Sequence, residues 1–276
     1  MTHDAAPILG LKNPAAPSVF QPANLLREAR RQRGLDHAEV PGLCLLDPDG
    51  DMVRHLRRTG RARPVNHWAC YHTEMWRFTW DGLEFGVVGC AVGAPFAVLV
   101  AEQMFASGCR FLVSITSSGQ IAPAGEPPYF ILIDRALRDE GTSYHYLPPS
   151  RFSEAAADVL ARLEALPAVP TVHRGATWTT DAPYRETEAA IAAHRAAGIL
   201  AVEMEAAALY AFSQARGHPV ACFAHVTNTM ARNEGDFEKG EADGAPEALS
   251  LAAAAARAWL AGETGVKRPT GGDRER

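Results

Sequence analysis

Segments with the apolar pattern of β-strands alternate with helix-length segments along most of this 276-residue chain. Apolar runs such as "RFLVSITSSG" (110–119) and "VACFAHVT" (220–227) flank helix-length runs such as "EAAALYAFSQARG" (205–217). This alternation predicts an α/β fold with a largely parallel sheet and helices on both faces. Because ligands of such sheets bind beyond the carboxyl ends of the strands, those ends are where we look for a site.

The alternation contains no internal repeat and no linker, so we expect a single domain over residues 22–261. The Pro- and Ala-rich residues 1–21 are expected to form an extended arm, and the polar residues 262–276 a disordered tail. Within the domain, Asn24 and Ser153 are expected to be the N-caps of two helices.

Charge and cysteine usage exclude several classes of protein. A net charge of -5 offers no basic surface for nucleic acid, and the one basic run, Arg54–Pro64, is interpreted as solvated surface. The five scattered cysteines form no CxxC pair, which argues against a zinc site and indicates a reducing compartment. Neither a signal peptide nor an apolar run of about 20 residues is found. We expect a soluble cytoplasmic protein without metal, cofactor, nucleic acid or membrane partner.

The stretch "AVEMEAAALYAF" (201–212) places two carboxylates at a strand-to-helix junction. Glu203 ends an apolar strand segment, and Glu205 begins a helical one. Burying an unpaired carboxylate is costly, so either these acids face water or a ligand binds there.

Three further strand ends carry polar or small residues, in "CAVGAP", "SITSSGQ" and "HVTNTM". Each has a plain structural interpretation, for example a turn shaped by Gly93. A parallel sheet would gather them on one edge, however, which favours a shared site. There the small residues Ser117, Ser118 and Gly119 can form a backbone nest for an anion, helped by the helix after Gly93.

The other strand ends suit a nucleoside. Glu205 can accept two hydrogen bonds from a vicinal diol, with Met204 against the sugar face. The amide of Asn228 suits a heterocyclic base that carries a carbonyl group. Trp178 is a candidate for stacking on the base, although a place in the core explains a tryptophan at least as well.

These motifs, in this order, resemble the purine-nucleoside and uridine phosphorylase superfamily over roughly Leu43–Leu260. The resemblance implies a mixed α/β sheet partly closed into a barrel, flanked by helices, in a homo-oligomer built from dimers. It implies phosphorolysis of a nucleoside, with inorganic phosphate attacking C1′. By the family's motif, Glu205 holds the ribose 2′- and 3′-hydroxyls, Met204 lines the sugar, and Glu203 lies nearby.

The chain departs from the family where phosphate should bind. In "LDPDGDMVR", Leu46 stands where a loop glycine is expected and Arg54 comes late, and Ser114 replaces a phosphate-binding arginine. Arg185 can compensate for these losses; an ion pair at a helix start explains it equally well.

The base subsite departs too. Thr187 and Ala189 stand where uridine phosphorylases carry Gln and Arg, so the resemblance does not support uridine. Asn228 favours an oxo-substituted purine, and hence a role in purine salvage.

Three functions remain open from the sequence. The first is a nucleoside phosphorylase, a pentosyltransferase that releases the free base and (deoxy)ribose 1-phosphate. The second is a nucleosidase that uses water, with Glu203, Asp47 or Asp181 as the carboxylate near that water. The third is a non-catalytic nucleoside-binding protein.

Overall fold

The computed structural model describes residues 6–10, 12–164, 166, 170–230 and 234–265. Its strands are β1 (Leu43–Asp47), β2 (Ala62–Pro64), β3 (Trp76–Trp80), β4 (Leu83–Gly89), β5 (Phe111–Gln120), β6 (Tyr129–Asp139), β7 (Phe152–Glu154), β8 (Val172–Thr180), β9 (Ile199–Glu203) and β10 (Val220–Asn228). Its α-helices are α1 (Pro22–Arg33), α2 (Asp51–Arg58), α3 (Ala94–Ala106), α4 (Ala157–Leu163), α5 (Glu188–Ala196), α6 (Ala206–Arg216) and α7 (Ala245–Gly265). Four short 3₁₀ turns join them: η1 (Pro7–Leu9), η2 (Ser143–His145), η3 (Pro183–Arg185) and η4 (Glu241–Gly244).

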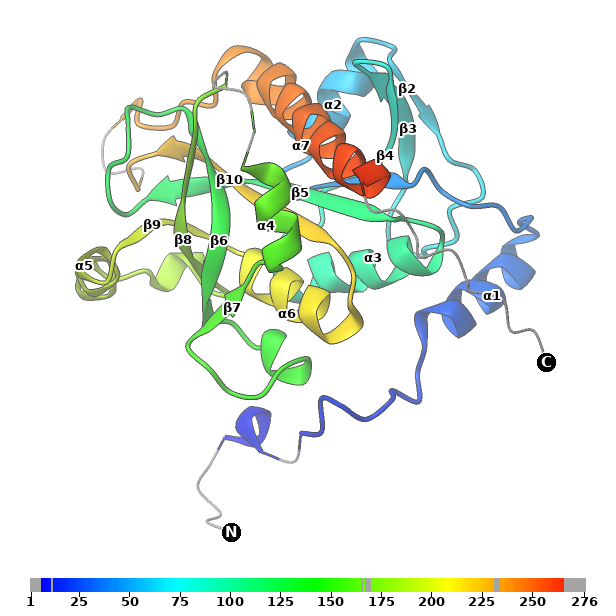
Figure 1. Ribbon diagram of the computed structural model, residues 1–276, viewed down its shortest axis with the longest axis horizontal. Coiled ribbons are helices and arrows are strands. Elements are labelled where there is room, and N and C mark those ends of the chain that lie inside the picture. The colour runs from blue at the N-terminus through cyan, green and yellow to red at the C-terminus, as the bar shows by residue number, and fades with distance from the viewer. Residues whose placement is uncertain (1–5, 11, 165, 167–169, 231–233, 266–276) are drawn as a thin grey trace, which may run out of the picture.

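The ten strands form one mixed sheet, part of which closes on itself. The order is β10-β6-β8-β9-β5-β1-β4-β3-β2, and an additional pairing of β10 with β5 closes β10, β6, β8, β9 and β5 into a barrel. Strands β1, β4, β3 and β2 continue the sheet beyond the barrel, and β7 pairs with β6 (Figure 1). The predicted mixed sheet, partly closed into a barrel and flanked by helices, is confirmed.

Helices cover the sheet on three sides, each over its own apolar cluster (Figure 1). α3 and α6 pack against each other and share a cluster with one face of β1 and β10. α2, α4 and α7 cover the opposite face, where α7 contacts both other helices. α5 lies on β9 beside a third cluster outside the barrel. Burial of these apolar faces is the main stabilising contribution to the fold.

Two predicted N-caps are wrong. α1 begins at Pro22 with Gln21 as its N-cap, because proline lacks the N–H group that a first turn leaves unpaired; Asn24 therefore lies inside the helix. Ser153 belongs to β7, opposite Ala136 of β6, and the N-cap of α4 is Ala156. In both cases a strand pairing or a proline outweighs the capping preference of a polar side chain.

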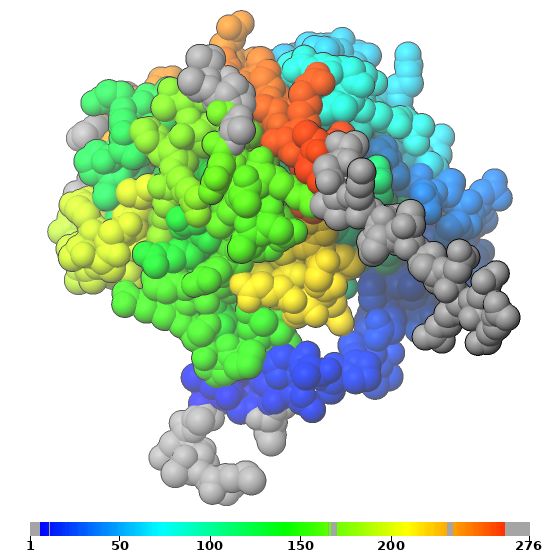
Figure 2. Space-filling view, in the orientation of Figure 1, coloured from blue at the N-terminus to red at the C-terminus, as the bar shows by residue number. Residues whose placement is uncertain are grey.

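The two ends of the chain are an N-terminal arm and the end of helix α7. The expected N-terminal arm contains η1 and crosses the lower edge of the molecule in the view of Figure 2, where the Nζ of Lys12 lies 3.1 Å from the Nδ1 of His145. At the other end, α7 continues to Gly265. The remainder of the expected disordered tail, residues 266–276, lies outside the described residues.

Candidate active site

The polar strand ends meet at one edge of the barrel. β1, β5 and β10 run parallel as neighbours, so the loop after Asp47, the segment 117–119 and Asn228 share this edge. β9 does not run parallel to them, because it crosses the end of β5 in the opposite direction, with Val202 opposite Gly119. Closure of the barrel thus brings the end of β9 against the end of β5.

Glu203, at the end of β9, is buried and fully hydrogen-bonded. Its Oε1 accepts hydrogen bonds from the hydroxyl groups of Thr177 and Thr179 on β8. Its Oε2 accepts from the backbone N–H groups of Glu205 and Ala206, each at 2.7 Å. Glu203 therefore ties β8 to β9 and caps the start of α6. Since protein donors engage both oxygens, we do not retain it as a sugar ligand or as the carboxylate near a water.

Glu205 is equally buried, with 2% of the residue exposed, but only half of its carboxyl group is bonded. Its Oε1 accepts a hydrogen bond of 2.7 Å from the backbone N–H of Gly93, whereas its Oε2 is buried without a partner. Gly93 precedes α3 with φ +89°, a conformation that glycine adopts at little cost. A buried oxygen without a partner is costly, and it is available to a ligand that donates hydrogen bonds.

Burial controls the ionisation of this pair. It raises the pKa of Glu205 to about 8, with a further contribution from the charge of Glu203. Burial also raises the pKa of Glu203, against the opposing effect of its hydrogen bonds. Four donors face Glu203, whereas only the backbone N–H of Gly93 and the hydroxyl of Thr116 lower the pKa of Glu205, so we assign the proton that the pair retains near neutral pH to Glu205.

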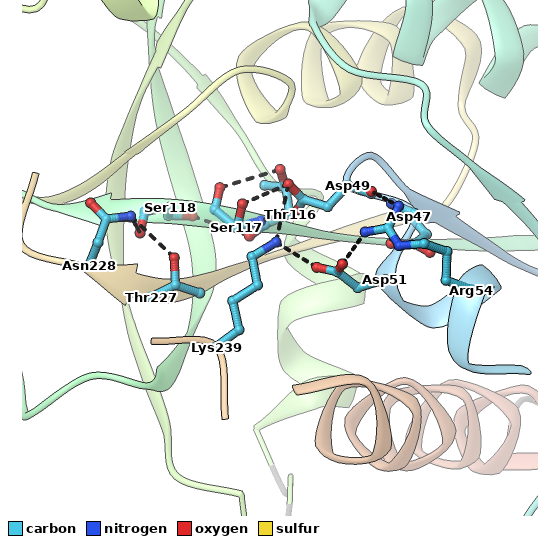
Figure 3. Close-up of polar contacts among 11 residues, drawn as sticks. Asp47, Asp49, Asp51, Arg54, Thr116, Ser117, Ser118, Thr227, Asn228 and Lys239 are labelled. Carbon is cyan, nitrogen blue, oxygen red and sulfur yellow. Dashed lines mark hydrogen bonds and ion pairs between the residues drawn. The ribbon is translucent and has the colours of Figure 1, made fainter. Parts of the chain in front are cut away.

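The segment predicted to bind an anion already contacts a carboxylate of the chain (Figure 3). The backbone N–H of Ser117 donates to Asp49 Oδ2, and the Ser117 hydroxyl donates to Asp49 Oδ1, both at 2.7 Å. Ser118 and Gly119 are paired with β10, and the Ser118 hydroxyl donates to the carbonyl of Thr116. The donors directed at an anion are therefore those of Ser117.

The charges around Asp49 pair with one another. The Nζ of Lys239 lies 2.6 Å from Oδ2 of Asp51 and 3.9 Å from Oδ1 of Asp49. The guanidinium of Arg54 pairs with Asp51 and donates to the Asp49 carbonyl at 2.9 Å (Figure 3). Ser114, where the resemblance implies an arginine, is buried with an unpartnered hydroxyl.

Asp47 shapes the loop that carries Asp49. Its two carboxyl oxygens accept from the backbone N–H groups of Gly50 (3.0 Å) and Val53 (2.9 Å). Burial raises the pKa of Asp47 to about 7, and the charges of Asp49 and Asp51 add to the rise. Since both oxygens hold the loop and the residue is only 2% exposed, Asp47 has no room to act on a water molecule.

Asn228 lies at the barrel closure, at an irregularity in the pairing of β10 with β5. Its Nδ2 donates to the carbonyl of Ser118 (3.4 Å) and to the hydroxyl of Thr227 (3.2 Å). Its Oδ1 accepts from the backbone N–H of Met230 at 2.9 Å. A base that bonds to this amide would compete with the Ser118 contact, which is the longest of the three.

The remaining candidates occupy different surroundings. Met204 is half-buried between the two glutamates. Trp178 packs in the cluster outside the barrel, tilted against His194, and its indole N–H donates to Asp139. Trp178 lies on the face of β8 opposite to that of Thr177 and Thr179, which contact Glu203, so we leave it out of the base subsite. Arg185 lies on η3 with an exposed side chain.

Two residues of this site were missed from the sequence. Asp49 follows a strand in the acidic segment "LDPDGD", a signal that was available, but its partner Ser117 is 68 positions away. Lys239 reaches Asp51 across 188 positions, and nothing in its sequence context indicates this contact.

Comparison with known proteins agrees with the fold. The chain matches the model of the phosphorylase superfamily over residues 43–261, and it belongs to that superfamily. The resemblance seen in the motifs is thereby confirmed.

Individual relatives are more distant. A guanosine phosphorylase of Halorubrum lacusprofundi is 26% identical over 143 residues, a match that covers 50% of this chain and 58% of the relative. A uridine phosphorylase of Thermococcus kodakarensis is 28% identical over 212 residues, covering 71% and 76%. The crystal structure of a uridine phosphorylase from Vibrio fischeri has a TM-score of 0.67 at 18% identity and covers 84% of this chain and 99% of its own, which supports the fold.

Two negative findings concern the described residues alone. None of their helices has the length and apolar character needed to span a bilayer. Among the same residues, no three His, Cys, Asp or Glu side chains are arranged to hold a metal ion.

Proposed function

We propose that this protein breaks the N-glycosidic bond of a nucleoside. The observation that supports this most strongly is the carboxyl group of Glu205, which is buried, fixed on one side by Gly93 and unpartnered on the other. A ribose diol supplies the hydrogen-bond donors that this oxygen lacks. Membership in the phosphorylase superfamily, with relatives named for guanosine and uridine, supports a nucleoside as the source of the diol.

The chemistry follows from the charge that develops as the bond breaks. The ribose gains oxocarbenium character while the base leaves with the bonding electrons. The ionised form of Glu205, which becomes more populated as the pH rises toward its pKa of about 8, stabilises this cation more than it stabilises the neutral ground state, which is the condition for catalysis. In this proposal Met204 packs against the sugar, Ser117 marks the acceptor end and Asn228 the base end.

The acceptor of the ribosyl group is either phosphate or water. Family membership favours phosphate, with free base and (deoxy)ribose 1-phosphate as products, and a purine-salvage pentosyltransferase as the enzyme. Family membership also supports a cytoplasmic homo-oligomer, which we include in this proposal. The contact between Asp49 and Ser117 favours water as the acceptor.

The experiment is a nucleoside panel with base release followed by chromatography. Inosine, guanosine, adenosine and uridine are each tested with their 2′-deoxy forms, with and without phosphate. We expect base release from at least one ribonucleoside, and a lower kcat/KM for its 2′-deoxy form because one donor to Glu205 is missing. Binding of nucleosides without any turnover would instead indicate the non-catalytic nucleoside-binding protein.

A further inference from the structure

The two donors of Ser117 that would recognise an oxyanion are occupied by Asp49. The backbone N–H and the hydroxyl of Ser117 each donate to a different oxygen of the Asp49 carboxylate at 2.7 Å. A carboxylate presents two negatively charged acceptor oxygens, as one edge of a phosphate does. Asp49 therefore satisfies, from within the chain, the donors that an anionic co-substrate would use.

The neighbouring charges also disfavour a second anion. Phosphate at Ser117 would meet Asp49 directly and Asp51 nearby, and like charges in a partly buried site repel. The two neighbouring cations are already paired, since Lys239 and Arg54 both contact Asp51. Asp49 also lies close enough to the sugar end for its charge to act on Glu205. This charge helps to raise the pKa of Glu205, to which burial and the charge of Glu203 contribute more.

Asp49 is better placed to hold a water molecule than the acids considered from the sequence, because its side chain is 27% exposed beside the end of β5. Asp47 is 2% exposed and its two oxygens hold the backbone of Gly50 and Val53, and Asp181 accepts from the backbone N–H of Gly141 on the protein surface. The two oxygens of an ionised carboxylate can accept about four hydrogen bonds, and Ser117 accounts for two of those at Asp49.

We propose that the acceptor is water held by Asp49, so that the enzyme is a nucleosidase; this rests on the glycosidic cleavage proposed above. The C1′–N bond breaks and its electron pair leaves with the base. The water oxygen forms the new bond to C1′ while Asp49 takes one water proton. The leaving base takes a proton from solvent, and Asp49 returns its proton to solvent. The products are free base and ribose, and no phosphate is consumed.

The product assay on the wild-type protein tests this directly. We expect base release at the same rate with and without phosphate, with reducing ribose as the sugar product and no ribose 1-phosphate in the ³¹P spectrum. Release that requires phosphate and yields ribose 1-phosphate would overturn the role of Asp49 and leave the glycosidic cleavage standing. No release from any nucleoside under either condition would overturn both proposals.

Two variants of Asp49 and one matched control sharpen the assay. Asp49→Asn keeps an acceptor for Ser117 but cannot take a proton, so kcat should fall about 100-fold or more. Asp158→Asn makes the same chemical change at an exposed position of α4 and should leave kcat unchanged. Wild-type kcat in Asp49→Asn would overturn the proposal.

The third readout is anion binding, which does not depend on activity. Asp49→Gly leaves the two Ser117 donors without their carboxylate. Phosphate should then raise the melting temperature of Asp49→Gly, while leaving that of the wild type and of Asp158→Asn unchanged. A phosphate-dependent rise in the wild type as large as in Asp49→Gly would contradict an occupied anion position.

Discussion

The two ends of the site use carboxylates in opposite ways. At the sugar end, Glu203 is saturated by four protein donors, and its neighbour Glu205 keeps an oxygen without a partner. At the acceptor end, Asp49 fills the Ser117 donors that would otherwise be available to an anion. At the sugar end an acceptor oxygen of Glu205 therefore lacks a donor, whereas at the acceptor end the donors of Ser117 are already bonded to a carboxylate of the chain. This difference is the ground on which we propose that the chain keeps the family's sugar motif and uses water in place of phosphate.

The largest expected effect is on stability, and it distinguishes the structural role of Glu203 from the proposed catalytic role of Glu205. Glu203→Ala removes the acceptor of four hydrogen bonds and leaves buried donors unpaired, so we expect a loss of about 3 kcal/mol or more in the free energy of unfolding. Glu203→Gln should cost less than half as much, since a turned amide can accept from the backbone groups and donate to the threonine hydroxyls. Urea unfolding measures both variants.

The control for that comparison is Glu188→Ala, which removes an exposed acid from the first turn of α5. Its cost should stay below about 1 kcal/mol. A Glu203→Ala protein as stable as this control would show that the four hydrogen bonds contribute nothing net.

The second prediction concerns activity at Glu205. Glu205→Ala should keep the fold, because Gly93 loses one bond and an unpartnered buried oxygen disappears. Its kcat/KM should fall about 100-fold, which corresponds to about 2.7 kcal/mol of transition-state stabilisation. Glu188→Ala again serves as the control in steady-state kinetics. Wild-type kcat/KM in Glu205→Ala would remove this residue from the mechanism.

The contrast between the two ends also shows what the sequence can reveal. The sugar end is encoded in one contiguous segment, and the letters "VEMEAA" by themselves indicate an acid pair at a buried junction. The acceptor end joins Asp49, Ser117 and Lys239 from three distant segments, and only the folded sheet brings them together. The alternation of apolar, strand-like segments with helix-length segments likewise predicts the strands and helices. It does not predict the antiparallel crossing of β9 on β5, which depends on barrel closure.

The third prediction uses the ionisation of Glu205. Its folded-state pKa of about 8 lies above the ordinary value of 4.5, so the folded protein holds a proton that the unfolded chain releases. The associated stability is complete below pH 4.5 and is lost as the pH rises to about 8, at no more than about 1.4 kcal/mol per pH unit.

Urea unfolding between pH 5 and 8 tests this, with Glu205→Gln as the comparison. The Gln variant cannot titrate at this position, so its stability should fall less steeply with pH than that of the wild type. Parallel pH profiles for the two proteins would place the retained proton elsewhere. The kcat/KM of the wild type should rise over the same interval, because the ionised form supports the developing cation.

The smallest expected effect concerns the base end, where Asn228 is bonded to the backbone on both sides of its amide. An amide cannot give up a proton near neutral pH, so it favours a base that leaves as a delocalised anion, such as hypoxanthine or guanine. Adenine leaves best after protonation. We therefore expect inosine or guanosine to exceed adenosine in kcat/KM by at least about tenfold, a difference of about 1.4 kcal/mol.

Asn228→Asp distinguishes base recognition from a purely structural role. The new carboxyl oxygen would face the carbonyl of Ser118, which favours the protonated acid, and that acid can donate a proton to adenine. The preference for 6-oxo nucleosides should therefore narrow, while Asn66→Asp, at an exposed position, leaves it unchanged. If Asn228 only fixes the junction of β10 with β5, Asn228→Asp will lower the melting temperature and slow every nucleoside by the same factor. A wild type that prefers adenosine would exclude base reading by this amide altogether.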